Sequence, residues 1–369
     1  MNPVGGTAGG TPDGAVADTG GTTADTTTAD PGRTAVVIVN WNRADLTVRA
    51  ARAVLAGGGA DQVVVVDNGS SDDSAAVLRR ELPGVTIVER TTNGGFAAGA
   101  NAGIRHADAD VVVLLNNDAV PAPGFVSALR QHLGRAGADV AAVTGRIVLA
   151  GRWARLPADA PADPDRRELR DHDGIRWTPS DGGDTRLNST GVRVDRVGNG
   201  MDRDWLAPSD RAADVEVFGF SGGASALRRT ALDDVGLLDE SLFMYYEDTE
   251  LAWRLRRRGW RVEHAADAVV EHDHSASSGV ASDLFVFRNA RNRLVVALWH
   301  AGWPTVLRAA ARTGVRGLRG LVSPGTRREA RLVLAAFADV AGHLPRHLVR
   351  RAHEAHRASV PRRSVDPGA

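Results

Sequence analysis

The chain has 369 residues, and 45 basic residues balance 45 acidic ones, so no overall charge favours nucleic acid as a partner. It has no cysteine, which excludes disulfides, thiolate metal sites and thiol nucleophiles. It also has no lysine, which excludes a P-loop lysine and a Schiff base. No run approaches the ~18 apolar residues that cross a bilayer. The first residues lack the pattern of a secretory signal, so we expect neither feature.

The charge is distributed unevenly along the chain. Residues 1–33 are mostly Gly, Thr, Ala, Asp and Pro, with four Asp against one Arg, and we expect a disordered tail there. Residues 301–369 hold 13 Arg against four acidic residues. This asymmetry predicts a partner at the C-terminal end of the molecule.

From residue 34 the sequence alternates between short β-branched runs and helical stretches. We predict strands at 35–39, 63–66, 85–88 and 111–115, and helices at 44–56, 73–82 and 96–106. This alternation predicts an α/β fold with a doubly wound, mostly parallel sheet. Ligands bind at the carboxyl ends of the strands in such sheets.

The remainder of the chain is less regular. We expect a catalytic domain over 34–280 with an irregular insertion at 151–214, which includes a hairpin near 192–197. A strand at 215–220, a helix near Arg229, a helix at 247–258 and strands near 260–262 and 269–270 follow. Residues 281–369 are predicted to form a basic, amphipathic helical region.

Polar residues end three of the predicted strands. Asp67 could accept a hydrogen bond from the imide N–H of uracil or thymine, or it could simply cap a turn. Asn116, Asn117 and Asp118 follow a buried strand, where a carboxylate could bind Mg²⁺ or Mn²⁺ beside a diphosphate. The alternative is a helix-capping loop. A single carboxylate provides few ligands for a metal ion, so a second protein ligand is expected.

Three further segments carry candidate chemistry. The glycine-rich segment 93–101 opens a helix and could bind phosphate. Glu247 and Asp248 start another helix, where one could act as a general base or both could complement the helix dipole. His272 and His274 could bind metal. The Arg-rich segment 287–293 could grip a diphosphate or form a solvated helix face.

Taken in order, the segments VIVNWN, VVDNGSSDDS, NGGFAAGAN, LLNND, GFSGGASALRR, YYEDTELAWRLRRRGW and EHDHSASSG resemble the family 2 glycosyltransferases of the GT-A fold. The resemblance runs from about residue 34 to residue 293. It is strongest to rhamnosyltransferase-like and galactofuranosyltransferase-like bacterial members, which build cell-wall or surface polysaccharide on a lipid carrier.

The resemblance implies a role for each matching position. Asp248 would be the catalytic base with Glu247 beside it, and Asp118 would bind the metal with His272. The expected donor-binding residues are Val39, Asn40, Asn42, Asp67, Asn93, Gly95, Asn116, Asn117, Gly222 and Gly223. The acceptor or diphosphate would contact Trp253, His274, Arg291 and Asn292.

The implied reaction is a single inverting transfer from a dTDP-sugar or UDP-sugar, with rhamnose favoured, to a hydroxyl of a glycan or lipid-linked acceptor, assisted by Mg²⁺ or Mn²⁺. The triplet is Asn-Asn-Asp rather than Asp-X-Asp, and the Gln-X-X-Arg-Trp signature of processive synthases is missing. We therefore expect the addition of one or a few sugars. The enzyme would be cytoplasmic and peripheral at the inner face of the plasma membrane. The basic C-terminal region would contact the membrane, cap the catalytic domain, or do both.

Two other functions compete with this interpretation. A catalytically inactive nucleotide-sugar-binding or scaffold protein could share the fold, although it would not need the Glu247–Asp248 pair. A nucleotidyltransferase would need a glycine-rich basic loop directly after the first strand, where this chain has Asn40, Trp41 and Asn42 instead.

Overall fold

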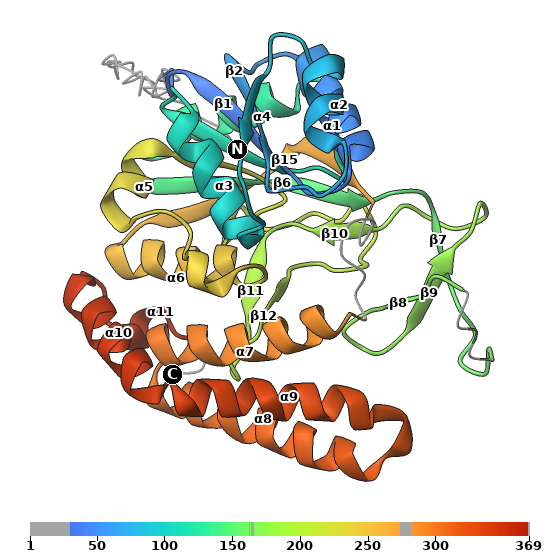
Figure 1. Cartoon of the computed structure of the whole chain (residues 1–369), viewed down its shortest axis with the longest axis vertical. Helices are drawn as coiled ribbons and strands as arrows, with labels where there is room; N and C mark the ends of the chain where they lie inside the picture. Colours follow the sequence, from blue (N-terminus) through green and yellow to red (C-terminus); the bar gives the residue numbers. More distant parts are fainter. Residues whose placement is uncertain (1–29, 162, 164–165, 274–281, 368–369) are drawn as a thin grey trace, which may run out of the picture.

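The computed structural model describes residues 30–161, 163, 166–273 and 282–367. Most of the predicted N-terminal tail lies outside these residues. Figure 1 shows an α/β domain with a layer of C-terminal helices packed below it. The first half of the domain alternates as predicted. Its elements are β1 (Thr34–Asn40), α1 (Ala44–Gly57), β2 (Gln62–Asp67), α2 (Ser74–Glu81), β3 (Thr86–Glu89), α3 (Gly95–His106) and β4 (Val111–Asn116).

The second half of the domain extends the same sheet. It contains β5 (Ala119–Pro121), α4 (Phe125–Arg135), β6 (Val140–Leu149), β10 (Leu187–Ser189), β13 (Glu216–Val217), β14 (Ala224–Arg228), α5 (Arg229–Val235), the 3-10 helix η1 (Glu240–Leu242), α6 (Glu247–Arg258) and β15 (Arg261–His272). The strand order is β13-β15-β6-β14-β4-β1-β2-β3, with β10 paired to β6 and β5 paired to β15. β1 pairs in parallel with β2 and β4, and β15 pairs in parallel with β6, whereas β14 runs antiparallel to both of its neighbours. The predicted mostly parallel sheet is confirmed.

Several predicted boundaries were wrong. The two strands expected near 260–262 and 269–270 are one strand, β15, whose register against β6 shifts between Ala265 and Val269. The strand expected at 215–220 is only β13. The insertion is more regular than expected, because it contains β7 (Trp153–Arg155), β8 (Leu169–Arg170), β9 (Arg176–Pro179), β11 (Val192–Val194) and β12 (Gly200–Asp202). β11 and β12 form the predicted hairpin.

The sheet is buried on both faces. One apolar cluster joins it to α1, α2 and α4, and a second joins it to α3, α5 and α6. Since the strands bury both faces, β1, β2 and β4 are nearly continuous runs of Val, Ile and Leu. The register sets Val39 beside Asn116 and Asn40 beside Asp67, so the polar strand ends meet at one edge of the sheet.

The C-terminal region consists of α7 (Asp283–His300), α8 (Trp303–Val322), the 3-10 helix η2 (Pro324–Thr326), α9 (Arg327–Gly342), α10 (Leu344–Arg357) and α11 (Arg362–Val365). A third apolar cluster, which includes Trp253 of α6 and Trp299 of α7, joins it to the catalytic domain. Among the described residues, no helix combines the length and the apolar character needed to span a membrane.

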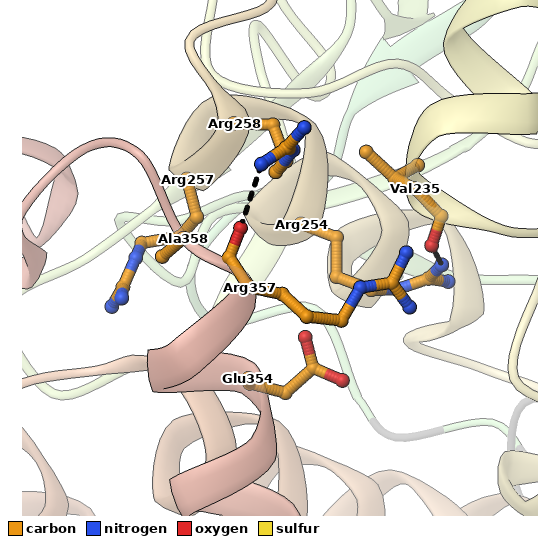
Figure 2. A pocket seen from close by; sticks show the side chains of 7 residues that line it. All are labelled: Val235, Arg254, Arg257, Arg258, Glu354, Arg357 and Ala358. Atoms are coloured by element: carbon orange, nitrogen blue, oxygen red, sulfur yellow. Dashed lines mark hydrogen bonds between the residues drawn. The ribbon is translucent and has the colours of Figure 1, made fainter.

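Arginines of α6 fasten the end of α10 to the domain. In Figure 2 the Arg258 side chain points to the backbone carbonyl of Arg357, and its NH1 atom donates to that oxygen over 2.9 Å. Arg254 donates to the carbonyl of Val235 over 2.8 Å. The hollow between these groups measures about 10 Å³, which leaves room for no more than a single water molecule. This junction is therefore structural and holds α6 in place.

Candidate active site

A cavity of about 510 Å³ opens at the carboxyl edge of the sheet. Strand ends β1 and β4, the first turns of α3, α6 and α7, and the end of β15 all reach it. The predicted residues that line it are Val39, Asn93, Gly95, Asn116, Asn117, Asp118, Gly222, Gly223, Glu247, Asp248 and His272. The structure thus brings the proposed base and the proposed metal ligands together in one cavity.

The acid pair at the start of α6 faces this cavity. The Asp248 carboxylate accepts the backbone N–H of Gly222 over 3.1 Å and also the N–H of Thr249. Burial raises the pKa of Asp248 above its usual value, although these two hydrogen bonds oppose the rise. Burial and the neighbouring Asp248 charge raise the pKa of Glu247 to about 8. Glu247 therefore keeps its proton at neutral pH while the Asp248 carboxylate is charged.

A histidine contacts the strand-end carboxylate in the wall of the cavity. The Nε2 atom of His272 lies 3.0 Å from Oδ1 of Asp118, and its Nδ1 atom lies 2.7 Å from Oδ1 of Asn188. Because an amide oxygen can only accept, the bond to Asn188 places a proton on Nδ1 and turns Nε2 toward Asp118.

The Asp118–His272 pair fits a divalent cation that takes its other ligands from the substrate. Mg²⁺ and Mn²⁺ accept carboxylate and imidazole ligands and commonly share phosphate oxygens and water. Within the described parts of the chain, no group of three or more His, Cys, Asp or Glu side chains could hold a metal by itself. The predicted second ligand is therefore available in His272, and a bound diphosphate would have to complete the site.

The first two strand ends form a hydrogen-bonded network beside the cavity. The Nδ2 atom of Asn40 donates to Oδ1 of Asp67 over 2.8 Å, and the Oγ atom of Ser70 also donates to Asp67. Asn42 adopts a left-handed backbone with φ of 53° and accepts the backbone N–H of Ser71 over 2.8 Å. The cavity wall here comes from Trp41 and Asn68 instead. Donor contacts by Asn40, Asn42 and Asp67 stay predictions.

The loop before the acid pair has an unusual backbone. Phe243, Tyr245 and Tyr246 have φ values of 67°, 68° and 71°, in the left-handed region that costs such residues free energy. The Nδ2 atom of Asn292 donates to the carbonyl oxygens of Leu242, Met244 and Tyr245 over 2.9, 3.0 and 2.8 Å.

Asn292 thus supports this loop through its backbone carbonyls. We had expected it to contact the acceptor or the diphosphate instead. A side chain on Gly95 would collide with the Phe243 carbonyl, so the glycine lets α3 approach the same loop.

Two other predicted contacts lie away from the cavity. Trp253 is buried in the core between α6 and α7, where its ring stacks on that of His300 with the ring centroids 6.2 Å apart. Arg291 lines a separate cavity of about 240 Å³, and its Nε atom donates to Asp339 over 2.8 Å. His274 lies outside the described residues.

The insertion supplies two cavity residues that the sequence did not single out, Asn188 of β10 and Asp202 of β12. Burial, with the Asp248 charge nearby, raises the pKa of Asp202 to about 6. The β11–β12 hairpin lies close to the first turn of α6, since a side chain on Gly200 would collide with Thr249. Weak periodicity in this segment gave no signal for either residue.

The sequence profile described as glycosyl transferase family 2 matches residues 35–236, which is more than half of the chain. The chain belongs to glycosyl transferase family 2. The match spans β1 to the end of α5 and therefore includes the strand-end carboxylate Asp118 and the two glycines Gly222 and Gly223. The predicted family membership is confirmed.

A relative from Mycobacterium tuberculosis, the N-acetylglucosaminyl-diphospho-decaprenol L-rhamnosyltransferase, is 36% identical over 120 residues. The aligned part spans 32% of this chain and 36% of the relative. Among solved structures, GalNAc-T7 with UDP, GalNAc and Mn²⁺ is 17% identical, with a TM-score of 0.50 over 85% of this chain and 57% of that chain. A mannosyltransferase from Pyrobaculum calidifontis with GDP-Man and Mn²⁺ is 20% identical, with a TM-score of 0.47 over 92% and 85% of the two chains. The predicted GT-A fold is confirmed.

Proposed function

We propose that this protein is an inverting glycosyltransferase that moves a sugar from a nucleoside diphosphate to a hydroxyl group of a lipid-linked or glycan acceptor. One observation supports the proposal above all others. The Asp248 carboxylate and the Asp118–His272 pair line the same cavity, which is large enough for a nucleotide sugar.

Asp248 would act as the general base. Its carboxylate takes the proton of the acceptor hydroxyl while that oxygen forms a bond to the anomeric carbon of the donor. The bond between the anomeric carbon and the diphosphate oxygen breaks, and the nucleoside diphosphate leaves with the electron pair. The Gly222 N–H holds the Asp248 carboxylate in place, and Glu247 stays protonated beside it.

Asp118 and His272 would hold the divalent cation together with oxygens of the diphosphate. A bound cation supplies charge stabilisation for the departing diphosphate. Gly222 and Gly223 line the cavity through their backbone, and the Gly223 carbonyl accepts the N–H of Asn116 over 2.9 Å. Glycines there leave room for the donor sugar.

The relative's name supports the finer assignment. That protein transfers L-rhamnose to a sugar on a decaprenyl diphosphate. By similarity we propose dTDP-rhamnose as the favoured donor, a lipid-linked sugar as acceptor, and a role in cell-wall or surface polysaccharide synthesis. The reaction would take place at the cytoplasmic face of the membrane, where the basic C-terminal region would contact the lipid surface.

A donor screen tests this function. Purified protein is supplied with Mn²⁺ or Mg²⁺, a water-soluble acceptor sugar, and either dTDP-sugars or UDP-sugars, and the released nucleotide is measured. We expect acceptor-dependent release of dTDP from dTDP-rhamnose. Donor binding without release from any donor would favour the alternative, an inactive nucleotide-sugar-binding protein.

A further inference from the structure

Exposed apolar side chains gather on the C-terminal helices. Among the described residues, 12 large apolar side chains are exposed, and eight of them lie between Trp303 and Val349. Five lie on α8, namely Trp303, Leu307, Val315, Leu318 and Val322. Leu307 is 66% exposed and Val322 is 79% exposed. Such concentration in one region distinguishes this patch from isolated surface hydrophobics.

The periodicity of α8 arranges these side chains on one face. At 3.6 residues per turn, the five exposed apolar residues and Ala311 fall within an arc of about 120°. Four arginines occupy the adjoining arc of about 80°. They are Arg308, Arg312, Arg316 and Arg319. The buried face follows, with Ala309, Thr313 and Gly317, while Thr305 is buried within the arginine arc in the first turn. Beyond its first turn, the helix therefore has separate packing, basic and exposed apolar faces.

The charge of α8 favours an anionic partner. The helix has four arginines and no acidic residue over its 20 positions. An apolar face bordered by arginines is typical of helices that lie in the plane of a bilayer interface. Arg316 pairs with Glu329 and Arg312 with Asp195 at the surface. Exposed ion pairs of this kind are weak, so long arginine side chains can lie along the apolar surface while their charged groups reach lipid phosphates.

We propose that the exposed apolar face of α8 and its border of arginines, together called the α8 face, bind the surface of an anionic phospholipid membrane. The biological reason rests on the proposed function, because a lipid-linked acceptor is held at such a surface. Membrane binding itself can be measured without any sugar transfer.

Contacts of α8 and α9 connect this face to the active-site cavity. The Nε atom of Arg308 donates to the Arg196 carbonyl over 3.0 Å, and Arg312 lies 3.7 Å from Asp195. Both partners lie in the turn of the β11–β12 hairpin, which brings Asp202 to the cavity.

At the other end, Arg328 of α9 pairs with Asp283 over 2.9 Å, in the first turn of α7. The same turn contributes Leu284 and Phe285 to the cavity. Figure 1 shows α8 lying along α9, on the side of the helical layer away from the sheet. The α8 face is therefore linked, through the hairpin and through α7, to two walls of the cavity.

Vesicle cosedimentation of the full chain tests the proposal. Vesicles contain phosphatidylcholine alone or phosphatidylcholine with phosphatidylglycerol. We expect binding to the anionic vesicles, weakened by salt, and little binding to the neutral ones. The double variant Leu307→Glu/Leu318→Glu should reduce binding by about tenfold or more, because it places carboxylates on the apolar face. Arg316→Gln/Arg319→Gln should reduce binding to the anionic vesicles alone.

The matched control is Leu55→Glu on α1, which changes a residue of similar exposure (52%) on the opposite part of the domain. It should bind like the wild type. Equal binding to neutral and anionic vesicles, no binding at all, or an equal loss in the control would overturn the proposal. A dimer in light scattering that Leu307→Glu/Leu318→Glu dissociates would also overturn it, since the face would then join two copies. Turnover of a water-soluble acceptor, unchanged in this double variant, separates failure here from failure of the proposed function.

Discussion

The Nε2 atom of His272 lies 3.0 Å from Oδ1 of Asp118, although 154 positions separate the two residues in the sequence. The contact arises because β15 pairs with β5 directly after β4, with His272 opposite Ala119. Asn188 fixes the histidine ring from its other side. The proposed metal site can therefore be tested through Asn188, which orients His272 but would not itself touch the cation.

We expect Asn188→Ala to weaken the apparent affinity for Mn²⁺ by about tenfold, since loss of such a supporting hydrogen bond typically costs 10–100-fold. Asp118→Ala should abolish metal-stimulated donor binding. Isothermal titration of donor with and without Mn²⁺ measures both effects. Asn289→Ala on α7 is the matched control and should leave the titration unchanged. An unaltered metal dependence in Asp118→Ala would remove this residue from the site.

The loop before the acid pair should depend on Asn292. Asn292→Ala removes three hydrogen bonds to carbonyls of a backbone with positive φ, and we expect a loss of about 2 kcal/mol in the free energy of unfolding. Because this loop positions Glu247 and Asp248, kcat should fall more than the donor KM rises. Steady-state kinetics below the unfolding transition, with Asn289→Ala as control, measure the ratio. Equal kcat in both variants would show that the loop keeps its shape without Asn292.

A buried ion pair that begins two residues after Asp248, at Glu250, should control stability. The Oε2 atom of Glu250 accepts a hydrogen bond from the Arg254 guanidinium over 2.7 Å, and its Oε1 atom lies 3.0 Å from Nε2 of His300. Burial alone would raise the pKa of Glu250, but the charges of Arg254 and His300 outweigh it and lower the pKa to about 2. The charged Glu250 carboxylate therefore stabilises the fold at pH values above the ordinary glutamate pKa. This stabilisation is lost as the pH falls toward 2, because the carboxylate is then protonated in the folded protein too. We expect Glu250→Gln to cost about 3 kcal/mol in urea unfolding at neutral pH, since it leaves Arg254 buried without its counter-charge. The difference in the free energy of unfolding between Glu250→Gln and the wild type should become smaller at acidic pH.

Glu247 should have the opposite pH dependence. Its pKa is raised in the folded protein by burial and by Asp248, so the folded state keeps a proton that the unfolded state has lost. The wild-type free energy of unfolding should therefore fall as the pH rises above the ordinary glutamate pKa, until the folded group also ionises. Glu247→Gln should flatten this slope. Chemical unfolding at a series of pH values measures it, and identical slopes in the two proteins would contradict the protonated state of Glu247.

Sequence alone predicted the parallel part of the sheet and the meeting of its strand ends. β1, β2 and β4 are uninterrupted β-branched and aliphatic runs that end in Asn40, Asp67 and Asn116, and this pattern specifies both the strand and its terminus. β6 was missed because alanine and glycine dilute its β-branched residues, and β14 was missed because its five residues include no β-branched side chain. β15 was divided in two because its register shift falls at a pair of alanines and an aspartate.

The contribution of the insertion to the cavity could not be predicted. Asp202 reaches the cavity through tertiary packing of the β11–β12 hairpin against α6, and no local periodicity encodes that contact. The role of Asn292 was also hidden, because an Arg-rich helix looks the same in sequence whether its asparagine faces a ligand or a loop. Sequence reasoning found residues at element ends and missed those positioned by long-range packing.

The most direct test of the central claim is the turnover of Asp248→Asn measured beside its donor affinity. The isosteric amide cannot accept the acceptor's proton, so kcat should fall by at least about 100-fold. Donor affinity in the presence of Mn²⁺ should equal that of wild type, and the exposed control Asp233→Asn should keep full turnover. A kcat for Asp248→Asn close to that of wild type would contradict the assignment of Asp248 as the base that faces the donor across this cavity.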